Sequence, residues 1–222
     1  MVCTLTPLTR AADAHPDLTR LSPTEEIWVD FAQKKVVVGG RVALSSGPIE
    51  LFACPTGTKE HESIIALRAS ARLVQAGLLA IGLEPDHADA QTPGSPLITT
   101  EKKGAPLHIL VRFQDEHHRW QSCRAEEWIK NTETKAATGE RWLFAGTAFA
   151  ENTETGELVP VGDTANLICV ANFPASVITL TGNSPHENSL LLYEAFEGRI
   201  PPIGTSIEVI LTATQTTPHN AT

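Results

Sequence analysis

Cys54, His61 and Glu62 stand close together in the stretch CPTGTKEHESII, residues 54–65. A thiolate, an imidazole and a carboxylate are ligands that zinc accepts in catalytic sites. A cysteine beside a histidine also matches a nucleophile that is activated by a base. These three residues are therefore candidate metal ligands, and Glu60 could replace Glu62 as the third group. No residue here completes a catalytic signature, so the plainer interpretation is a charged, solvated loop next to a buried cysteine.

Two predicted strands position this stretch. Residues 48–54 and 61–69 are rich in strand-forming residues, and the small polar residues between them predict a hairpin. At a tight hairpin tip, Cys54 and His61 would face each other as a cross-strand pair. Exposed loops often carry binding residues. The candidate binding residues at this tip are Thr58, Lys59, Glu60 and His61.

A second polar cluster, DEHH at 115–118, lies between the alternating segments 106–115 and 118–125. Adjacent residues of a strand point to opposite faces, so these side chains could share a metal only within a turn. The alternation predicts a second hairpin with this cluster at its tip. Hairpin tips favour polar residues in any case, so a solvated tip is preferred to a metal site.

The remaining pattern predicts an α+β fold with a mainly antiparallel β-sheet. One clear helix is expected at about 70–82, with Ser70 as N-cap and Gly82 at the C-terminal end. One or two short helices are expected, one of them at 125–131. A regular alternation of strands and helices would indicate a parallel doubly wound sheet, and the predicted elements do not alternate in this way. Further strands are predicted within 27–44 (two, with Gly39–Gly40 as a bulge or turn), 141–150, 157–162, 166–173 and 200–213. The segment 189–196 fits a strand or a helix.

The chain is expected to form one globular domain over residues 25–213. Residues 1–24 are predicted to be an extended N-terminal arm or the remnant of a signal peptide. Residues 214–222 are predicted to be a disordered tail. The segment 83–106 is rich in Pro, Gly and Asp and is expected to be a long loop, which makes it a second candidate contact surface.

Composition excludes several function classes. The chain has 222 residues and a net charge of −9, which disfavours nucleic acid as a partner. No apolar run reaches the ~18 residues of a membrane-spanning helix. The four cysteines form no C-x-x-C pair, and no nucleotide-binding motif is present. The sequence therefore leaves the cofactor unknown, with a single metal ion as the candidate. A disulfide between Cys54 and Cys169 would suit an exported domain, but its connectivity cannot be derived from sequence.

Several longer stretches carry a family resemblance. GPIELFACPTGTKEHESI, LVQAGLLAIGLEP, FAGTAF, DTANLICVANFPASVITL and LLLYEAFEGRIPPIGTSIEVIL resemble the YdjY-domain family of bacterial, planctomycete-type proteins. The resemblance runs from about Glu26 to Leu211. It implies a single-domain, extracytoplasmic protein that is periplasmic or associated with the envelope. The family's namesake is described as ferredoxin-like, but the scattered cysteines of this chain carry over no iron–sulfur cluster.

Two hypotheses for function remain open at this point. The first is a non-enzymatic envelope accessory or binding protein that acts through contacts with another envelope protein. It is favoured by the lack of a complete catalytic signature and by the resemblance to exported proteins. The alternative is a metal- or thiol-dependent enzyme that uses the Cys54/His61 loop. A stoichiometric metal ion or an unusually reactive thiol would favour the enzyme.

Overall fold

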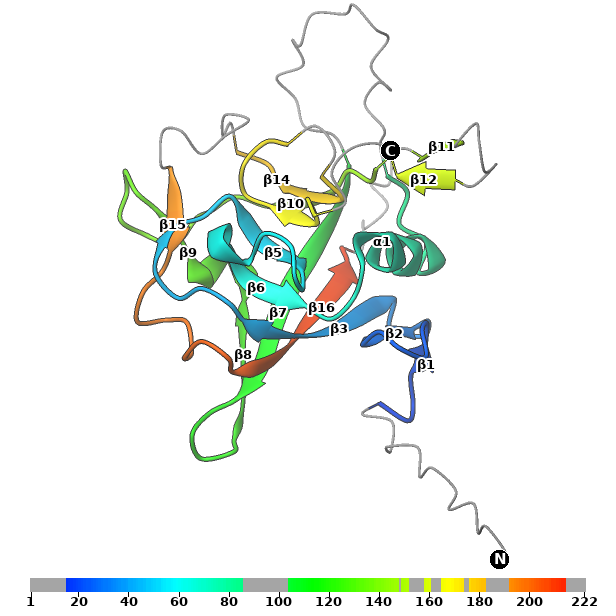
Figure 1. Cartoon of the computed structure of the whole chain (residues 1–222), viewed down its shortest axis with the longest axis horizontal. Coiled ribbons are helices and arrows are strands. Elements are labelled where there is room, and N and C mark those ends of the chain that lie inside the picture. The colour runs from blue at the N-terminus through cyan, green and yellow to red at the C-terminus, as the bar shows by residue number, and fades with distance from the viewer. Residues whose placement is uncertain are drawn as a thin grey trace, which may run out of the picture.

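A computed structural model describes residues 15–85, 104–147, 149–151, 158–160, 165–173, 176–182 and 192–214 of this chain. Within them the protein is built mainly of strands, with one α-helix and two 3-10 turns (Figure 1). The helical elements are α1 (Ala71–Ala80), η1 (Glu60–Glu62) and η2 (Ala125–Trp128). The strands are β1 (Thr19–Arg20), β2 (Ile27–Asp30), β3 (Lys35–Val42), β4 (Gly47–Pro48), β5 (Leu51–Pro55), β6 (Ser63–Leu67), β7 (Ala105–Gln114), β8 (Trp120–Arg124), β9 (Ile129–Asn131), β10 (Trp142–Phe144), β11 (Phe149–Glu151), β12 (Leu158–Pro160), β13 (Ile168–Cys169), β14 (Ile178–Leu180), β15 (Tyr193–Ala195) and β16 (Ser206–Ala213).

Eight of these strands close into a mixed barrel. Their order is β3–β16–β7–β10–β14–β13–β5–β6, and β6 pairs with β3 to complete the ring. The pairings β5–β6 and β13–β14 are parallel, and the others around the ring are antiparallel. The predicted α+β fold with a mainly antiparallel sheet and one clear helix is therefore confirmed.

Smaller elements extend this barrel. Strands β2 and β1 continue the sheet from one edge of β3, and β8 pairs with β7. Strands β4, β15 and β9 form a separate three-stranded sheet, and β11 pairs with β12. The predicted hairpin of 106–115 with 118–125 is confirmed as β7–β8. Figure 1 shows that this hairpin extends well beyond the barrel.

The main core is apolar and continuous from the barrel to the helix. It includes Val36, Val38, Trp142 and Phe144 from the strands and Leu78 from α1, all of them buried. Helix α1 packs against β2 and β3. Burial of an aliphatic side chain contributes about 1.5–3 kcal/mol, so this shared core is the main source of stability for the fold.

The ends of α1 follow the capping rules that the sequence suggested. The hydroxyl of Ser70 accepts a hydrogen bond from the Leu73 N–H at 3.4 Å, which satisfies a donor of the first turn. At the other end, Gly82 has a φ of +85°, a conformation that glycine adopts without strain. The N–H groups of Gly82 and Leu83 reach back to the carbonyls of Leu79 and Leu78, which completes a Schellman motif.

Two local predictions are wrong. The segments around Cys54 and His61 do not form a hairpin, because β5 and β6 are parallel neighbours and the chain between them runs back along the barrel. Gly39–Gly40 are not at a turn, since both lie inside β3. They mark the point where the partner of β3 changes from β2, which pairs up to Val38, to β6, which pairs from Gly40 onward.

Part of the predicted N-terminal arm lies on the sheet. Within residues 15–24, β1 pairs with β2, with Thr19 opposite Val29. Residues 1–14, 86–103 and 215–222 lie outside the described residues. They hold most of the predicted arm, loop and tail. Among the described residues, no helix is long and apolar enough to cross a membrane.

Candidate functional site

The crossover between β5 and β6, residues 56–62, holds the four predicted binding residues. Thr56 donates its N–H to the Leu67 carbonyl at 2.8 Å, which starts the return of the chain. The Thr58 hydroxyl donates to the Pro55 carbonyl at 2.6 Å. Glu60 accepts the Gly57 N–H at 2.8 Å and pairs with Arg41 of β3 at 2.5 Å. These bonds fix the shape of the crossover loop.

Lys59 ties the same loop to the segment around β13. Its ammonium group donates to Asn166 Oδ1 at 3.0 Å and lies 4.8 Å from the centroid of the Phe173 ring. It is also 3.8 Å from the Glu62 carboxylate. Lys59 therefore joins two segments that are far apart in the sequence, which is a structural role.

Cys54 and His61 do not face each other. Cys54 is fully buried and clusters with Leu51 and Cys169, whereas the His61 side chain is 79% exposed. Glu62 is half-buried and is 4.0 Å from His61 at the nearest atoms. Within the described ranges, no group of three or more His, Cys, Asp or Glu side chains is placed to hold a metal ion.

The described cysteines are all at least partly buried. Cys54 and Cys169 are buried as free cysteines in the same cluster. Burial, together with a smaller contribution from the nearby Glu127 carboxylate, raises the pKa of Cys123 to about 11. Since the thiolate is the reactive form, Cys123 is expected to be inert near neutral pH.

Glu62 gives a pH dependence that can be measured. Burial raises its pKa above the ordinary value of 4.5, and the neighbouring Glu50 carboxylate raises it further. The folded protein thus binds this proton more tightly than the unfolded chain. The contribution of protonated Glu62 to the stability of the fold is therefore complete below pH 4.5. It is lost as the pH rises through the pKa that Glu62 has in the folded protein. We expect Glu62→Gln to have a higher melting temperature than the wild type at pH 7, and this difference to shrink toward pH 4.

Asp30 provides a control with the opposite sign. Its pKa is lowered from 3.8, mainly because it accepts the Gln33 N–H at 2.9 Å. The stabilising contribution of Asp30 is present above pH 3.8 and is lost as the pH falls through the lower folded-state pKa. Asp30→Asn should therefore lower the melting temperature at pH 7. A Glu62→Gln variant that also melts earlier at pH 7 would contradict the assignment for Glu62.

A row of aromatic and charged side chains crosses the outside of the sheet from β8 to β2. We call Trp120, Arg112, Glu208, His15 and Trp28 the outer row. The Arg112 guanidinium lies 4.5 Å from the Trp120 ring centroid, and it donates to Glu208 from Nε at 2.9 Å and from Nη2 at 2.5 Å. Glu208 also bonds His15 Nε2 at 3.0 Å, and the His15 ring packs edge-on against Trp28 with centroids 4.8 Å apart.

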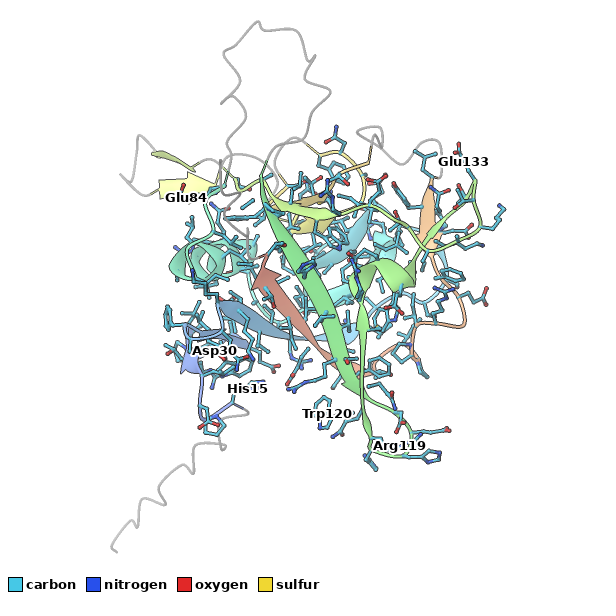
Figure 2. The ribbon with its side chains drawn as sticks, turned by 180° about the vertical axis from the view of Figure 1, so that it is seen from behind. His15, Asp30, Glu84, Arg119, Trp120 and Glu133 are labelled. Carbon is cyan, nitrogen blue, oxygen red and sulfur yellow. The ribbon has the colours of Figure 1, made fainter. Side chains whose placement is uncertain are left out.

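Trp120 is the exposed end of the outer row. It is 55% exposed, although its ring is held by Arg112, which is in turn held by Glu208. Figure 2 shows Trp120 and Arg119 on the projecting hairpin, far from Glu84 and Glu133. Leu110, also exposed, lies on the neighbouring strand β7. An exposed aromatic side chain that is already fixed in position is suited to contact another molecule.

The tip of this hairpin is ordered by Asp115. Its carboxylate accepts the N–H groups of His117 and Arg119 at 2.9 and 3.0 Å, and also bonds the side chains of Arg119 and Gln121. These bonds, chiefly the one from Arg119 N–H, lower the pKa of Asp115 well below its usual range. His117 and His118 are exposed. The polar cluster at 115–118 thus serves the turn, as the plainer interpretation expected.

The outer row could not be predicted from the sequence. Its members come from the N-terminal segment, β2, β7, β8 and β16, so only the strand order brings them together. One local signal was available in HRWQSCR, where alternation places a tryptophan on a polar face of a strand.

Comparison with known proteins identifies the family of this chain. A model of the YdjY domain matches residues 27–212, which is most of the chain. The chain belongs to the YdjY-domain family. The resemblance expected from the sequence is therefore confirmed, and the matched range contains the barrel except for Ala213, the last residue of β16. No curated protein matches this YdjY domain, and no solved structure matches it.

Proposed function

We propose that this YdjY-domain protein is a non-enzymatic accessory or binding protein of the cell envelope, and that it works through contact with another protein. The observation that carries the proposal is the projecting β7–β8 hairpin, which presents Trp120 with more than half of its surface exposed. Tryptophan is among the residues that dominate binding energy at protein interfaces.

The support of Trp120 strengthens this interpretation. A side chain that is immobilised on binding costs about 0.5–1.5 kcal/mol of conformational entropy. Trp120 already contacts Arg112, which donates two hydrogen bonds to Glu208. The ring is therefore partly immobilised before any partner binds, which lowers the entropy lost on binding. Arginine adds a charged group beside the aromatic ring, a combination that is enriched in interfaces.

The crossover loop is a weaker choice for the contact surface. The polar groups of Thr58, Lys59 and Glu60 already bond to other parts of the fold. Of the three, Thr58 is exposed, and so is His61, whose side chain is 79% exposed. The envelope location is part of the proposal. It is supported by membership of a family whose proteins are expected to be exported.

Site-specific photo-cross-linking tests the proposal. A photoreactive phenylalanine analogue replaces Trp120 in the full chain, in cells of the bacterium that makes the protein. We expect an adduct with one foreign envelope protein, identified by mass spectrometry. The same analogue at Glu84, exposed and far from the hairpin in Figure 2, is the matched control and should not give this adduct. Adducts that are the same from both positions, or none from position 120, would argue against a contact through the hairpin.

A further inference from the structure

We propose that the free edge of β8 pairs with the β8 edge of a second copy of this chain and forms a weak two-fold dimer. Among the described residues, β8 has β7 as its only strand neighbour. An unpaired strand edge presents N–H and C=O groups that can continue a sheet. The inference concerns a second copy of this chain, so it does not depend on the proposed function.

The hairpin turn shows which residues of β8 face the free edge. Asp115 donates its N–H to the Arg119 carbonyl at 3.0 Å, and His118 adopts a left-handed φ of 58°. This is a three-residue loop closed by a hydrogen-bonded pair. Hydrogen-bonded pairs alternate along an antiparallel ladder, so Gln121 and Cys123 bond toward β7. The backbone groups of the residues between them, Trp120 and Ser122, point away from β7.

A side-chain cap then limits the register. Arg124 would be the third outward-facing residue, but its N–H already donates to Glu127 Oε1 at 3.1 Å. The outward donors left are those of Trp120 and Ser122. A two-fold axis at Gln121 places Trp120 of one copy opposite Ser122 of the other. Each such pair exchanges two hydrogen bonds, so that the symmetric pairing forms four.

The side chains favour the same partner. The antiparallel register puts the two Trp120 residues at diagonal positions across the new pairing, on the outer face of both sheets. Diagonal neighbours are about 7–8 Å apart, within reach of aromatic rings. The Trp120 ring is stacked on Arg112 within its own chain, and its exposed part is available to the second Trp120. A two-fold arrangement is also the commonest for identical subunits.

The dimer should be weak. One short strand pairing and two rings bury much less than the ~1,200 Å² of stable complexes. We expect a dissociation constant on the order of 10–100 µM. At low concentration the hairpin thus stays available to another protein.

Sedimentation of the full chain over a range of concentrations measures the association. Ser122→Pro removes the outward N–H and leaves the bonds to β7 in place, as proline is tolerated at strand edges. It should weaken dimerisation by at least about tenfold, because two of the four hydrogen bonds are lost. Ser122→Ala, which keeps that N–H, is the matched control and should dimerise like the wild type. A wild-type chain that stays monomeric at millimolar concentration would overturn the proposal.

Disulfide trapping tests the register without relying on the proline variant. Gln121→Cys is placed in a chain whose Cys3 and Cys123 are replaced by serine, with oxidised glutathione as the oxidant. The two new thiols lie opposite each other in the proposed pairing, so a disulfide-linked dimer should form readily. Ser122→Cys in the same background should form at most a tenth as much. Equal trapping of both variants, or trapping of neither, would contradict the pairing. A monomeric chain that still cross-links a foreign protein from position 120 would reject only this inference.

Discussion

Gln75→Met is expected to lower the free energy of unfolding by about 2–4 kcal/mol, because two buried hydrogen bonds are lost while the side-chain size is kept. Gln75 lies in α1 and is almost fully buried. Its amide nitrogen donates to the Thr147 carbonyl at 3.0 Å, and its amide oxygen accepts the Thr147 N–H at 2.9 Å. The side chain therefore pairs with the backbone of Thr147, in the connection between β10 and β11, as a neighbouring strand would.

Urea denaturation followed by tryptophan fluorescence measures this loss. The matched control is Gln114→Met at the end of β7, where the glutamine side chain is exposed. The control should change the free energy of unfolding by less than about 0.5 kcal/mol, as surface substitutions usually do. Equal stability of Gln75→Met and the wild type would show that the helix does not depend on these two bonds.

Gly40→Ala should destabilise the fold by about 2–3 kcal/mol, through overpacking of the barrel. A Cβ at this position would lie 2.8 Å from the Ala66 carbonyl oxygen and 3.3 Å from the Leu67 Cα. Both atoms belong to the backbone of β6, which pairs with β3 at this point. The backbone cannot move aside without disturbing the closure of the barrel, so the strain has no cheap release.

Gly139→Ala is the matched control for the glycine substitution. A Cβ at Gly139 would meet no other atom within 4 Å. Its effect on the free energy of unfolding should stay within about 1 kcal/mol and can be stabilising, since alanine restricts the unfolded chain. A chevron or equilibrium urea experiment on both variants separates the two expectations. Similar stability of the two variants would mean that β6 tolerates a side chain at position 40.

Helix α1 and the β7–β8 hairpin were predictable because their signals are local. Ser70 caps the helix, and the apolar residues that follow it repeat at helical spacing. Alternation on both sides of Asp115 predicted the hairpin, and the turn residues lie where they were expected. Each signal lies within one segment, so no knowledge of the rest of the chain was needed.

The direction of β6 relative to β5 could not be predicted in the same way. Small polar residues indicate that the chain leaves a strand. They do not indicate whether the next strand runs antiparallel or parallel to the first. Parallel neighbours usually need a connection of about a dozen residues or more. Here residues 56–62 suffice, because the η1 turn and the bonds of Glu60 fold the loop compactly. As a result, Cys54 enters a buried cluster and His61 faces the solvent.

Gly39 and Gly40 show the same limit. Two adjacent glycines are common at turns and bulges, and the sequence alone favoured one of these two. The structure places them inside β3, where β2 gives way to β6 as the partner strand. Gly40 is small because the backbone of β6 approaches it, which is a contact between segments far apart in the sequence.

The outer row was also hidden for a topological reason. Arg112 and Glu208 are partners because β7 and β16 pair in a register that sets them opposite each other. No pattern within either strand reveals that register. The family match likewise names the domain without assigning a role to any of these residues.

The central claim is that the hairpin around Trp120, and not the loop around His61, contacts a partner protein. The most direct measurement places the same photoreactive analogue at position 120 and at position 61 in parallel cultures. We expect a specific foreign adduct from position 120 and none from position 61, although the His61 side chain is more exposed. A specific adduct from position 61 alone would contradict this claim and return the contact surface to the crossover loop.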